Sequence, residues 1–305
     1  MEHHLIKKGP YPRAGEGAKA AKCHIDSPQT RSPSYNLAFQ DPDFLLRDEL
    51  RPVRLQLELL KPELIQQEQG VESTVVIFGS ARFKAPDIAK RQLSSIRKGI
   101  ETNPSDPRLK KQLKTARRDM DNSKYYEEAK KLAQIISNHC QCAGKVAHVV
   151  TTGGGPGVME AANRGAHDVG AKSMGLNIVL PLEQAPNPYI TPELSFQFHY
   201  FAIRKMQFLM RAQALVVFPG GFGTLDELFD ALTLVQTKKI KPIPILLFGK
   251  GFWQKVLNFE IMVEEGTISP EDLYLFQYVE TAEQAWEVIS GIENHHEKNW
   301  EAGPD

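Results

Sequence analysis

The sequence predicts an α/β fold in which a doubly wound, Rossmann-like parallel sheet carries an N-terminal helical extension. Short β-branched segments that are apolar along their whole length recur through the chain, and segments with apolar residues at helical intervals separate them. Strands of this kind are typical of a parallel sheet covered by helices on both faces. With 305 residues, 41% of them apolar, the chain is long enough to bury one large core.

Five segments have the composition of buried strands, and a helical pattern follows each of the first four. The strand segments are STVVIFGSAR (73–82), KVAHVVTTGGGPG (145–157), SMGLNIVLPLE (173–183), QALVVFPGGFG (213–223) and KPIPILLFGKG (241–251). The helical segments are YYEEAKKLAQIISNHC (125–140), GVMEAANRGAHDVG (157–170), YFAIRKMQFLMRA (200–212) and TLDELFDALTLVQTKK (224–239). Their alternation predicts one Rossmann-like domain over residues 71–305.

Two segments precede this domain. Residues 1–42 are rich in Gly, Pro, Ser, Lys and Arg, and they cannot bury enough surface to offset the entropy of ordering, so we expect a flexible arm. Residues 43–70 place Leu and Val at helical intervals and form the helical extension. Pro52 and Pro62 are expected to divide this extension into short helices.

A strongly basic and polar insertion, about residues 83–122, separates the first strand from its helix. Aromatic side chains that stack on bases are sparse in it, which favours a solvated helical excursion over a contact with nucleic acid or polyphosphate. A lid and an oligomer contact are further roles that the sequence leaves open.

The composition disfavours several classes of protein. Lys plus Arg and Asp plus Glu each number 37, so no global field attracts the chain to nucleic acid or to an acidic membrane. The apolar runs are too short to span a bilayer of about 30 Å, and residues 1–21 lack the apolar region of a secretory signal, so we expect a cytoplasmic protein. Cys23, Cys140 and Cys142 show no disulfide framework, and we expect the last two to lie at a helix end rather than on a metal.

Glycines follow three of the predicted strands, at the turns into the next helices. These turns are Gly79-Ser80, Gly153–Gly157 and Gly220–Thr224. In an open parallel sheet the turns at the carboxyl ends of the strands converge on the ligand. Glycine lets the backbone approach a phosphate closely, and the free amides of the next helix then bind it. The three turns predict a phosphate pocket of nucleotide size.

The common nucleotide motifs are absent from these turns. Neither long glycine turn ends in Gly-Lys-Ser/Thr, so the lysine and the hydroxyl of a P-loop are missing. The dinucleotide pattern Gly-x-Gly-x-x-Gly fails as well, because Val158 and Asp226 occupy its third glycine position. Thr224 and Glu227 stand at the spacing of a helix capping box. They are equally placed to form the floor of an anion-binding site, and the spacing alone leaves both interpretations open.

Three motifs resemble the Lonely Guy family of nucleotide phosphoribohydrolases. They are TTGGGPGVMEAANRGA (151–166), the pair Arg204-Lys205 and PGGFGTLDE (219–227), in the order expected for the family. The resemblance implies a Rossmann-like catalytic domain, a homodimer or larger homo-oligomer, and no cofactor or metal. It also implies hydrolysis of the N-glycosidic bond of nucleoside 5′-monophosphates, either cytokinin ribotides or purine and pyrimidine monophosphates. The arm, the helical extension and the basic insertion depart from the compact plant-type members.

The resemblance assigns Arg204 and Glu227 as the catalytic pair. Together with the glycine turns, it gives the expected substrate-binding residues: Ser80, Gly154, Gly155, Gly157, Lys205, Gly220, Gly221, Gly223, Thr224 and Thr233. Glycosidic cleavage passes through an oxocarbenium-like sugar, which a carboxylate stabilises. We expect the helix dipole and a nearby arginine to keep Glu227 ionised, so that it holds a ribose hydroxyl and orients or deprotonates the attacking water.

Three other interpretations compete with the hydrolase. The same turns suit a protein that holds a nucleotide or a molybdenum cofactor without cleaving it, although pure binding does not require an acid at Glu227. A DNA-associated protein is disfavoured by the neutral net charge, while the basic insertion keeps it open. A pyridoxal-dependent decarboxylase needs a Schiff-base lysine, and nothing around Lys205, the one nearby lysine, supports that role.

Overall fold

The computed structural model describes residues 11–21, 25–141, 146–181 and 185–300. Cys23 and Cys142 lie outside these ranges, whereas Cys140 ends a helix as expected. The chain forms two compact units, Met1–Glu58 and Leu59–Asp305. Within the described residues, no helix combines the length and the apolar character that a membrane span requires.

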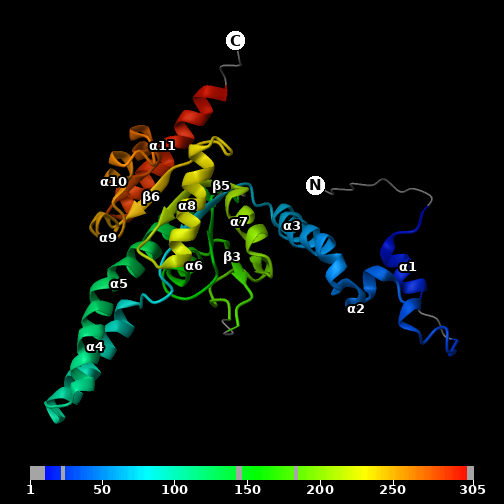
Figure 1. Ribbon diagram of the computed structural model, residues 1–305, viewed down its shortest axis with the longest axis horizontal. Coiled ribbons are helices and arrows are strands. Elements are labelled where there is room, and N and C mark those ends of the chain that lie inside the picture. The colour runs from blue at the N-terminus through cyan, green and yellow to red at the C-terminus, as the bar shows by residue number, and fades with distance from the viewer. Residues whose placement is uncertain (1–10, 22–24, 142–145, 182–184, 301–305) are drawn as a thin grey trace. The chain divides into compact units, whose positions relative to one another are not determined.

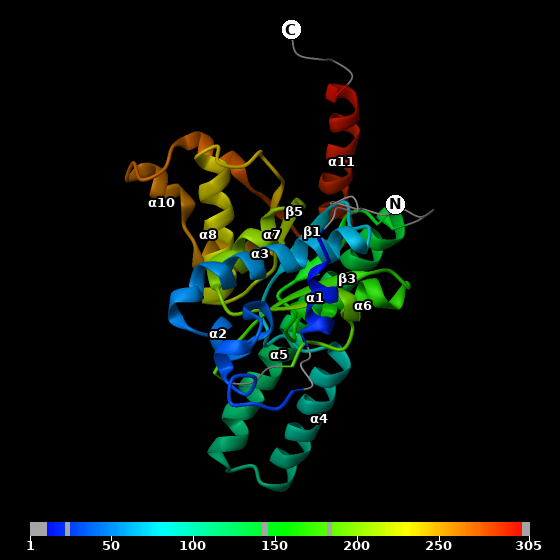
Figure 2. The same ribbon diagram turned by 90° about the vertical axis from the view of Figure 1, so that its right-hand side faces the viewer.

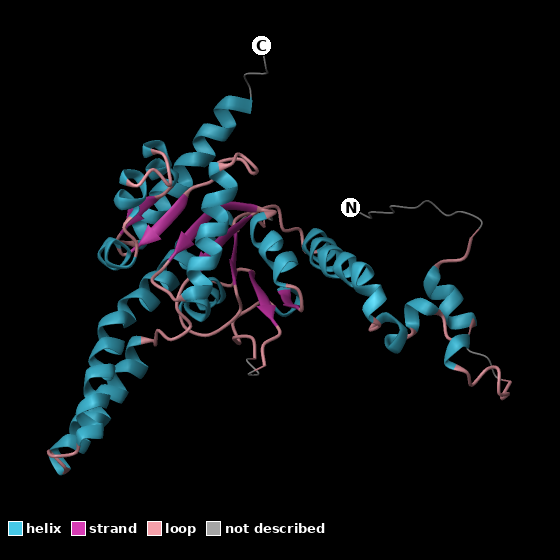
Figure 3. Ribbon diagram, in the orientation of Figure 1, coloured by secondary structure: helices cyan, strands magenta, loops and turns pink. Residues whose placement is uncertain are grey.

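Seven parallel strands form one sheet in the second unit, which confirms the predicted fold class (Figures 1 and 3). Their order is β4-β3-β2-β1-β5-β6-β7. The strands are β1 (Thr74–Phe78), β2 (Val149–Thr152), β3 (Ser173–Ile178), β4 (Ser195–Phe198), β5 (Ala212–Val217), β6 (Ile245–Phe248) and β7 (Gln277–Val279). Five of them fall in the predicted segments. The edge strands β4 (SFQF) and β7 (QYV) were not predicted, because polar residues interrupt them and they are not apolar along their length.

Helices cover both faces of this sheet, as the alternation of side chains along β1 demonstrates. Val75 and Ile77 belong to one buried core, and Val76 and Phe78 belong to the other. On the first face lie α5 (Pro107–Cys140), α6 (Val158–Asp168) and α11 (Ala282–Trp300). On the second lie α7 (Phe201–Leu209), α8 (Phe222–Gln236), α9 (Lys250–Val256) and α10 (Phe259–Glu264). The 3-10 helices Pro192–Leu194 and Pro270–Leu275 complete the described elements of this unit after β3.

Short helices occupy the first unit. They are α1 (Ala14–Ala20), α2 (Pro42–Leu45) and the 3-10 helices Pro33–Tyr35, Ala38–Gln40 and Asp48–Leu50. None of them buries a residue, in keeping with a composition that offers little apolar surface. The division into an arm at 1–42 and an extension at 43–70 stays a prediction.

The expectation that prolines divide the extension is wrong, because α3 (Arg51–Glu68) runs through Pro62. Pro52 lies in the first turn, where a helix needs no N–H donor. Pro62 is buried in the helix interior and costs one hydrogen bond. Contacts on both sides of it offset that cost: Glu63 pairs with Arg211 at 3.0 Å, and Gln207 donates to the Leu59 carbonyl at 3.0 Å.

The basic insertion forms a helical hairpin of α4 (Pro86–Thr102) and the first half of α5, which projects from the sheet in two perpendicular views (Figures 1 and 2). A helical excursion was expected, but the helix after β1 does not begin at Tyr125. It begins at Pro107 and continues without interruption for 34 residues. The insertion is therefore an extension of a core helix, and its second arm is fixed rigidly to the body.

Replacement of Gly165 by alanine tests the packing of α6 against α5. A Cβ at Gly165 would collide with the Lys130 carbonyl oxygen and lie 2.8 Å from the Ala133 Cβ. We expect Gly165→Ala to lower the free energy of unfolding by about 1–3 kcal/mol, because the helices must move apart. Gly291→Ala is the matched control: nothing lies within 4 Å of its added Cβ, and we expect a gain of up to about 1 kcal/mol. Chemical denaturation of both variants measures the difference, and equal effects would contradict the tight contact.

Candidate functional site

A cleft of about 910 Å³ opens at the carboxyl ends of the central strands. The chain leaves β1 toward β2, β3 and β4 on one side, and then returns to β5 on the other side of β1. This reversal makes the β1–β5 boundary the topological switch point, where open α/β sheets bind their ligands. All three predicted glycine turns contribute to the lining of the cleft.

Ser80 joins the two long glycine turns through its backbone. Its amide donates to the Pro219 carbonyl at 3.0 Å, and its carbonyl accepts from the Val158 amide at 3.1 Å. Gly79 lies so close to its neighbours that a Cβ there would stand 2.7 Å from Val158 and 2.9 Å from Phe218. The turn after β1 therefore fixes the spacing of the turns after β2 and β5.

A buried polar network, which the sequence did not reveal, holds the turn after β2. The Asn187 side-chain amide donates to the carbonyls of Gly154 and Gly155 at 3.2 and 3.1 Å. The same amide lies 2.9 Å from the Asn163 carboxamide oxygen, which also accepts from Thr152 at 2.7 Å. Asn163 is fully buried, and the available signal in the sequence was an asparagine beside the two alanines Ala161 and Ala162 of a predicted helix. The network fixes the backbone that faces the cleft.

Gly154 and Gly157 shape this turn rather than line the cleft. Their φ angles are +77° and +73°, in the left-handed region that favours glycine. Neither belongs to the lining of the cleft, whereas Gly155 does. Contact of Gly155 with a ligand stays a prediction, whereas Gly154 and Gly157 are required by the backbone conformation of the turn.

The capping-box interpretation of Thr224 and Glu227 is wrong. Helix α8 begins at Phe222, with Gly221 as its N-cap, and the Leu225 amide bonds the Gly221 carbonyl at 3.0 Å. Thr224 is therefore the third residue of the helix and cannot serve as the N-cap. Its side chain occupies the space that a Cβ on Gly220 would need, and it lines the cleft.

Glu227 points into the cleft and is 8% exposed. Its Oε1 lies 3.9 Å from Nη1 of Arg204, and it makes no hydrogen bond to another described residue. Burial raises the pKa of Glu227 to about 7, although Arg204 acts to lower it. The carboxyl is therefore not held fully ionised at neutral pH, contrary to the expectation, because desolvation outweighs the effect of the nearby arginine.

Arg204 is held in place on three sides. Its Nε donates to the Leu176 carbonyl at 2.7 Å, and its guanidinium lies 5.0 Å from the centroid of the Phe208 ring. Gly153 allows this position, because a Cβ there would stand 2.8 Å from Nη2 and 2.9 Å from the Met159 sulfur. The side chain lines the cleft. Its Nε is hydrogen-bonded to the backbone, and its Nη1 lies toward Glu227.

The structure does not bring Lys205 and Thr233 to the cleft. Nζ of Lys205 pairs with Asp226 at 2.7 Å, because successive helical residues face different directions. Thr233 is exposed and donates its hydroxyl to the Phe229 carbonyl, one turn earlier in α8. Neither belongs to the lining, which departs from their expected contact with the ligand.

Several lining residues were not predicted. They are Arg82, Phe83 and Asn122 from the two ends of the insertion, Asn177, Ile178 and Leu180 at the end of β3, and Phe201, Phe222, Phe252 and Val256 on the helices. Asn177 carried a signal, since a polar residue interrupts the apolar run Leu176–Leu180. Asn122 carried none, because its approach to the cleft depends on how α5 packs.

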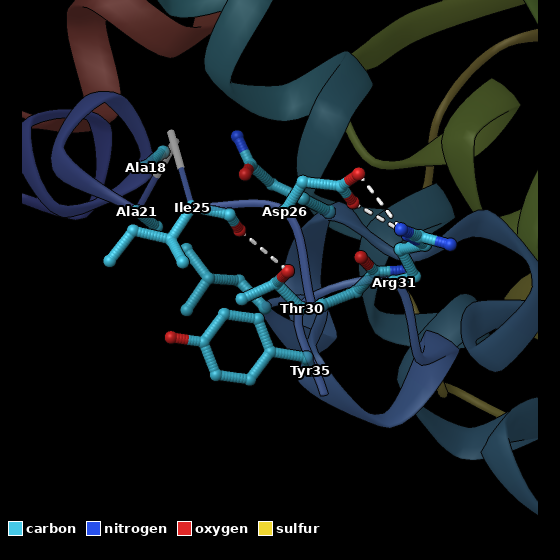
Figure 4. A pocket seen from close by; sticks show the side chains of 10 residues that line it. Ala18, Ala21, Ile25, Asp26, Thr30, Arg31 and Tyr35 are labelled. Carbon is cyan, nitrogen blue, oxygen red and sulfur yellow. Dashed lines mark hydrogen bonds and ion pairs between the residues drawn. The ribbon is translucent and has the colours of Figure 1, made fainter. Parts of the chain in front are cut away.

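A second hollow lies within the N-terminal unit (Figure 4). It measures about 470 Å³, and Asp26 and Arg31 at its edge are joined by a 2.8 Å hydrogen bond. Both side chains are largely exposed, and no predicted site residue lies there. Across the described residues, no group of three or more His, Cys, Asp or Glu side chains is placed to hold a metal ion.

The fold and the cleft define a Rossmann-like α/β protein in which a buried acid, Glu227, and an arginine, Arg204, face a cleft lined by glycine turns.

A family model described as "Possible lysine decarboxylase" matches residues 159–289. The probable cytokinin riboside 5′-monophosphate phosphoribohydrolase LOGL3 of Oryza sativa subsp. japonica is 27% identical over 172 residues, which cover 51% of this chain and 76% of the rice protein. Cytokinin riboside 5′-monophosphate phosphoribohydrolase LOG4 of Arabidopsis thaliana is 30% identical over 152 residues, covering 48% and 67%. The chain belongs to this Lonely Guy (LOG) family.

Among solved structures, the X-ray structure of TM1055 from the Northeast Structural Genomics Consortium aligns with 72% of this chain and 99% of its own length. Its TM-score is 0.43 and its sequence identity is 19%.

Glu227→Gln tests the burial of the acid through the pH dependence of stability. The folded protein keeps the proton up to a pH of about 7, whereas the ordinary pKa is 4.5, so folding binds a proton between these values. The free energy of unfolding therefore falls from pH 4.5 to pH 7, by an amount on the order of 2–3 kcal/mol from this group. We expect the variant to match wild type near pH 4.5 and to be more stable at pH 8.

Chemical denaturation at the two pH values measures this difference. Glu265→Gln, at an exposed glutamate, is the control and should show no pH-dependent gain. A Glu227→Gln variant that is less stable than wild type at pH 8 would show that the ionised carboxylate stabilises the fold.

Proposed function

We propose that this protein hydrolyses the N-glycosidic bond of nucleoside 5′-monophosphates, giving a free base and ribose 5-phosphate. The observation that carries the proposal is Glu227, a buried carboxyl that lines the cleft beside Arg204 and has no hydrogen-bond partner among the described residues. A protein that only binds a nucleotide gains nothing from such a group, because burying it costs stability. The relatives named above as phosphoribohydrolases support the same reaction.

Glu227 is suited to assist the attacking water. Cleavage develops positive charge on the ribose ring, so a carboxylate at the sugar stabilises the transition state. A pKa of about 7 is also near the optimum for a general base at neutral pH. In its ionised form Glu227 accepts a hydrogen bond from a ribose hydroxyl and takes a proton from the attacking water as the bond to the base breaks. A proton from solvent then completes the free base.

Arg204 is suited to the negative charge of the reaction. Its Nε is committed to the Leu176 carbonyl, so the guanidinium is preorganised and loses little freedom when a ligand binds. The permanent charge stabilises electron density on the departing base or on the phosphate. The same positive charge of Arg204 attracts the anionic substrate into the cleft, also at a pH where Glu227 is still partly protonated.

The 5′-phosphate is assigned to the glycine turns. Backbone amides at Gly220–Thr224 stand at the start of α8, where the helix dipole favours an anion. Ser80 and Arg82 lie on the neighbouring turn in the same cleft, and Arg82 is exposed with no ion pair among the described residues. Binding energy from the phosphate would hold the sugar against Glu227.

Release of ribose 5-phosphate from a panel of nucleoside 5′-monophosphates, including AMP and isopentenyladenosine monophosphate, tests the reaction directly. We expect release from at least one member and none from the matching nucleoside, because the phosphate positions the sugar. Glu227→Gln should lower kcat by about 10² or more, and the exposed Glu265→Gln should not. If calorimetry detects binding of these nucleotides but no ribose 5-phosphate is released, the protein binds nucleotides without hydrolysing them, and the proposal is wrong.

The pH profile tests the role of Glu227. We expect kcat/KM to rise about tenfold per pH unit below 7 and to level off above it, since only the ionised form acts as a base. The substrate phosphate ionises near pH 6 as well. The ratio of wild type to Glu227→Gln at each pH cancels that contribution. A ratio that falls as pH rises would assign Glu227 as an acid instead.

A further inference from the structure

The α4–α5 hairpin concentrates positive charge in a neutral chain. Residues 84–124 contain twelve Lys and Arg against five Asp and Glu, a net charge of +7, whereas the whole chain is neutral. The compensating acids lie elsewhere in the sequence. Because salt screens charges beyond about 10 Å at 0.1 M, a partner at the hairpin experiences the local charge and not the total.

The basic side chains of α5 follow one exposed face of the helix. Lys110, Lys114, Arg117 and Lys124 are all exposed and are spaced by four, three and seven residues. At 1.5 Å per residue they extend over about 21 Å. Asp121 is the one acid on this line. The helix packs through a different face, as the burial of Ala116 and Ser123 demonstrates.

Most of these cations have no carboxylate partner. Within the described hairpin, the ion pairs are Lys84–Asp119, Arg91–Asp87 and Arg118–Asp119, and Asp106 caps the start of α5. The exposed cations without an ion pair there are Lys90, Arg97, Lys98, Arg108, Lys110, Lys111, Lys114, Arg117 and Lys124. A surface stabilised by its own salt bridges would alternate the two signs.

We propose that the α4–α5 hairpin is a binding surface for the phosphate backbone of double-stranded nucleic acid. Lipid is disfavoured, because Ile88 is the one large apolar side chain in residues 84–124 that is exposed, and a membrane-binding helix needs an apolar face. Stacking on single strands is disfavoured because residues 84–124 contain no aromatic residue. A duplex presents regularly spaced phosphates to a straight row of cations and requires neither feature.

The projecting position of the hairpin suits this partner. The hairpin stands away from the sheet in both perpendicular views, so its exposed faces are accessible (Figures 1 and 2). Asn122, five residues beyond Arg117, lines the cleft from another face of α5, so the cation row itself lies outside the cleft. The surface does not depend on the proposed hydrolysis.

Fluorescence anisotropy with labelled 24-base-pair duplexes of DNA and of RNA tests the proposal on the full-length protein. We expect sequence-independent binding at 50 mM salt that weakens steeply toward 200 mM. In the variant Lys110→Ala/Lys114→Ala/Arg117→Ala, the slope of log K against log salt should fall by about 2.7, since each phosphate contact contributes about 0.9. Over that fourfold change in salt, wild type should lose about 40-fold more affinity than the variant. The DNA and RNA arms distinguish the two sources of the same backbone.

A second triple variant, Lys61→Ala/Lys239→Ala/Lys241→Ala, removes the same charge from exposed positions outside the hairpin and should bind as wild type does. The thermal unfolding temperature of both variants verifies that they fold. Three outcomes would overturn the proposal: no binding of either duplex at 50 mM salt, an equal loss in the two triple variants, or binding to phosphatidylserine vesicles in place of the duplexes.

Discussion

The backbone of Ser80 is the constraint on which the candidate site depends. Its amide and its carbonyl bond the turns after β5 and β2, so that one residue at the end of the central strand sets the spacing of both. Gly79 permits this approach, because any side chain there would collide with Val158 and Phe218. The glycine turns that line the cleft are therefore positioned by the sheet itself, through hydrogen bonds that exist without a ligand. Such preorganisation is what makes electrostatic stabilisation effective in catalysis.

Within this frame, Glu227 and Arg204 define the electrostatics of the cleft. The two groups lie 3.9 Å apart, yet burial still raises the pKa of Glu227 to about 7. The Nε of Arg204 donates a hydrogen bond to the Leu176 carbonyl, so only the Nη1 side of the guanidinium faces Glu227. A tighter, bidentate pair would ionise Glu227 fully and lower its basicity. The loose arrangement leaves the pKa of Glu227 at about 7, at a cost in the stability of the fold.

The sequence was sufficient wherever a local pattern carries the information. The buried run at β1 and the glycines at the turns after β1, β2 and β5 predicted the sheet and the position of the cleft, because strand ends converge in any parallel sheet. The places where prediction failed depend on packing. Pro62 lies inside a helix because distant contacts compensate for it, and Lys205 turns to Asp226 because of the phase of α7. The pKa of Glu227 is set by desolvation, which no spacing of residues encodes.

The hairpin illustrates the same limit for charge. The neutral net charge of the chain argued against a polyanionic partner. However, the net charge sums over surfaces whose electrostatic fields salt screens from one another. What matters is whether cations on one surface have acids within reach, and most of those on α4 and α5 do not. The continuity of α5 then gives the hairpin a second consequence, because a single rigid helix places Lys110, Lys114 and Arg117 outside and Asn122 at the cleft. The insertion, which is separate from the glycine turns in the sequence, is thus connected to the cleft through one continuous helix.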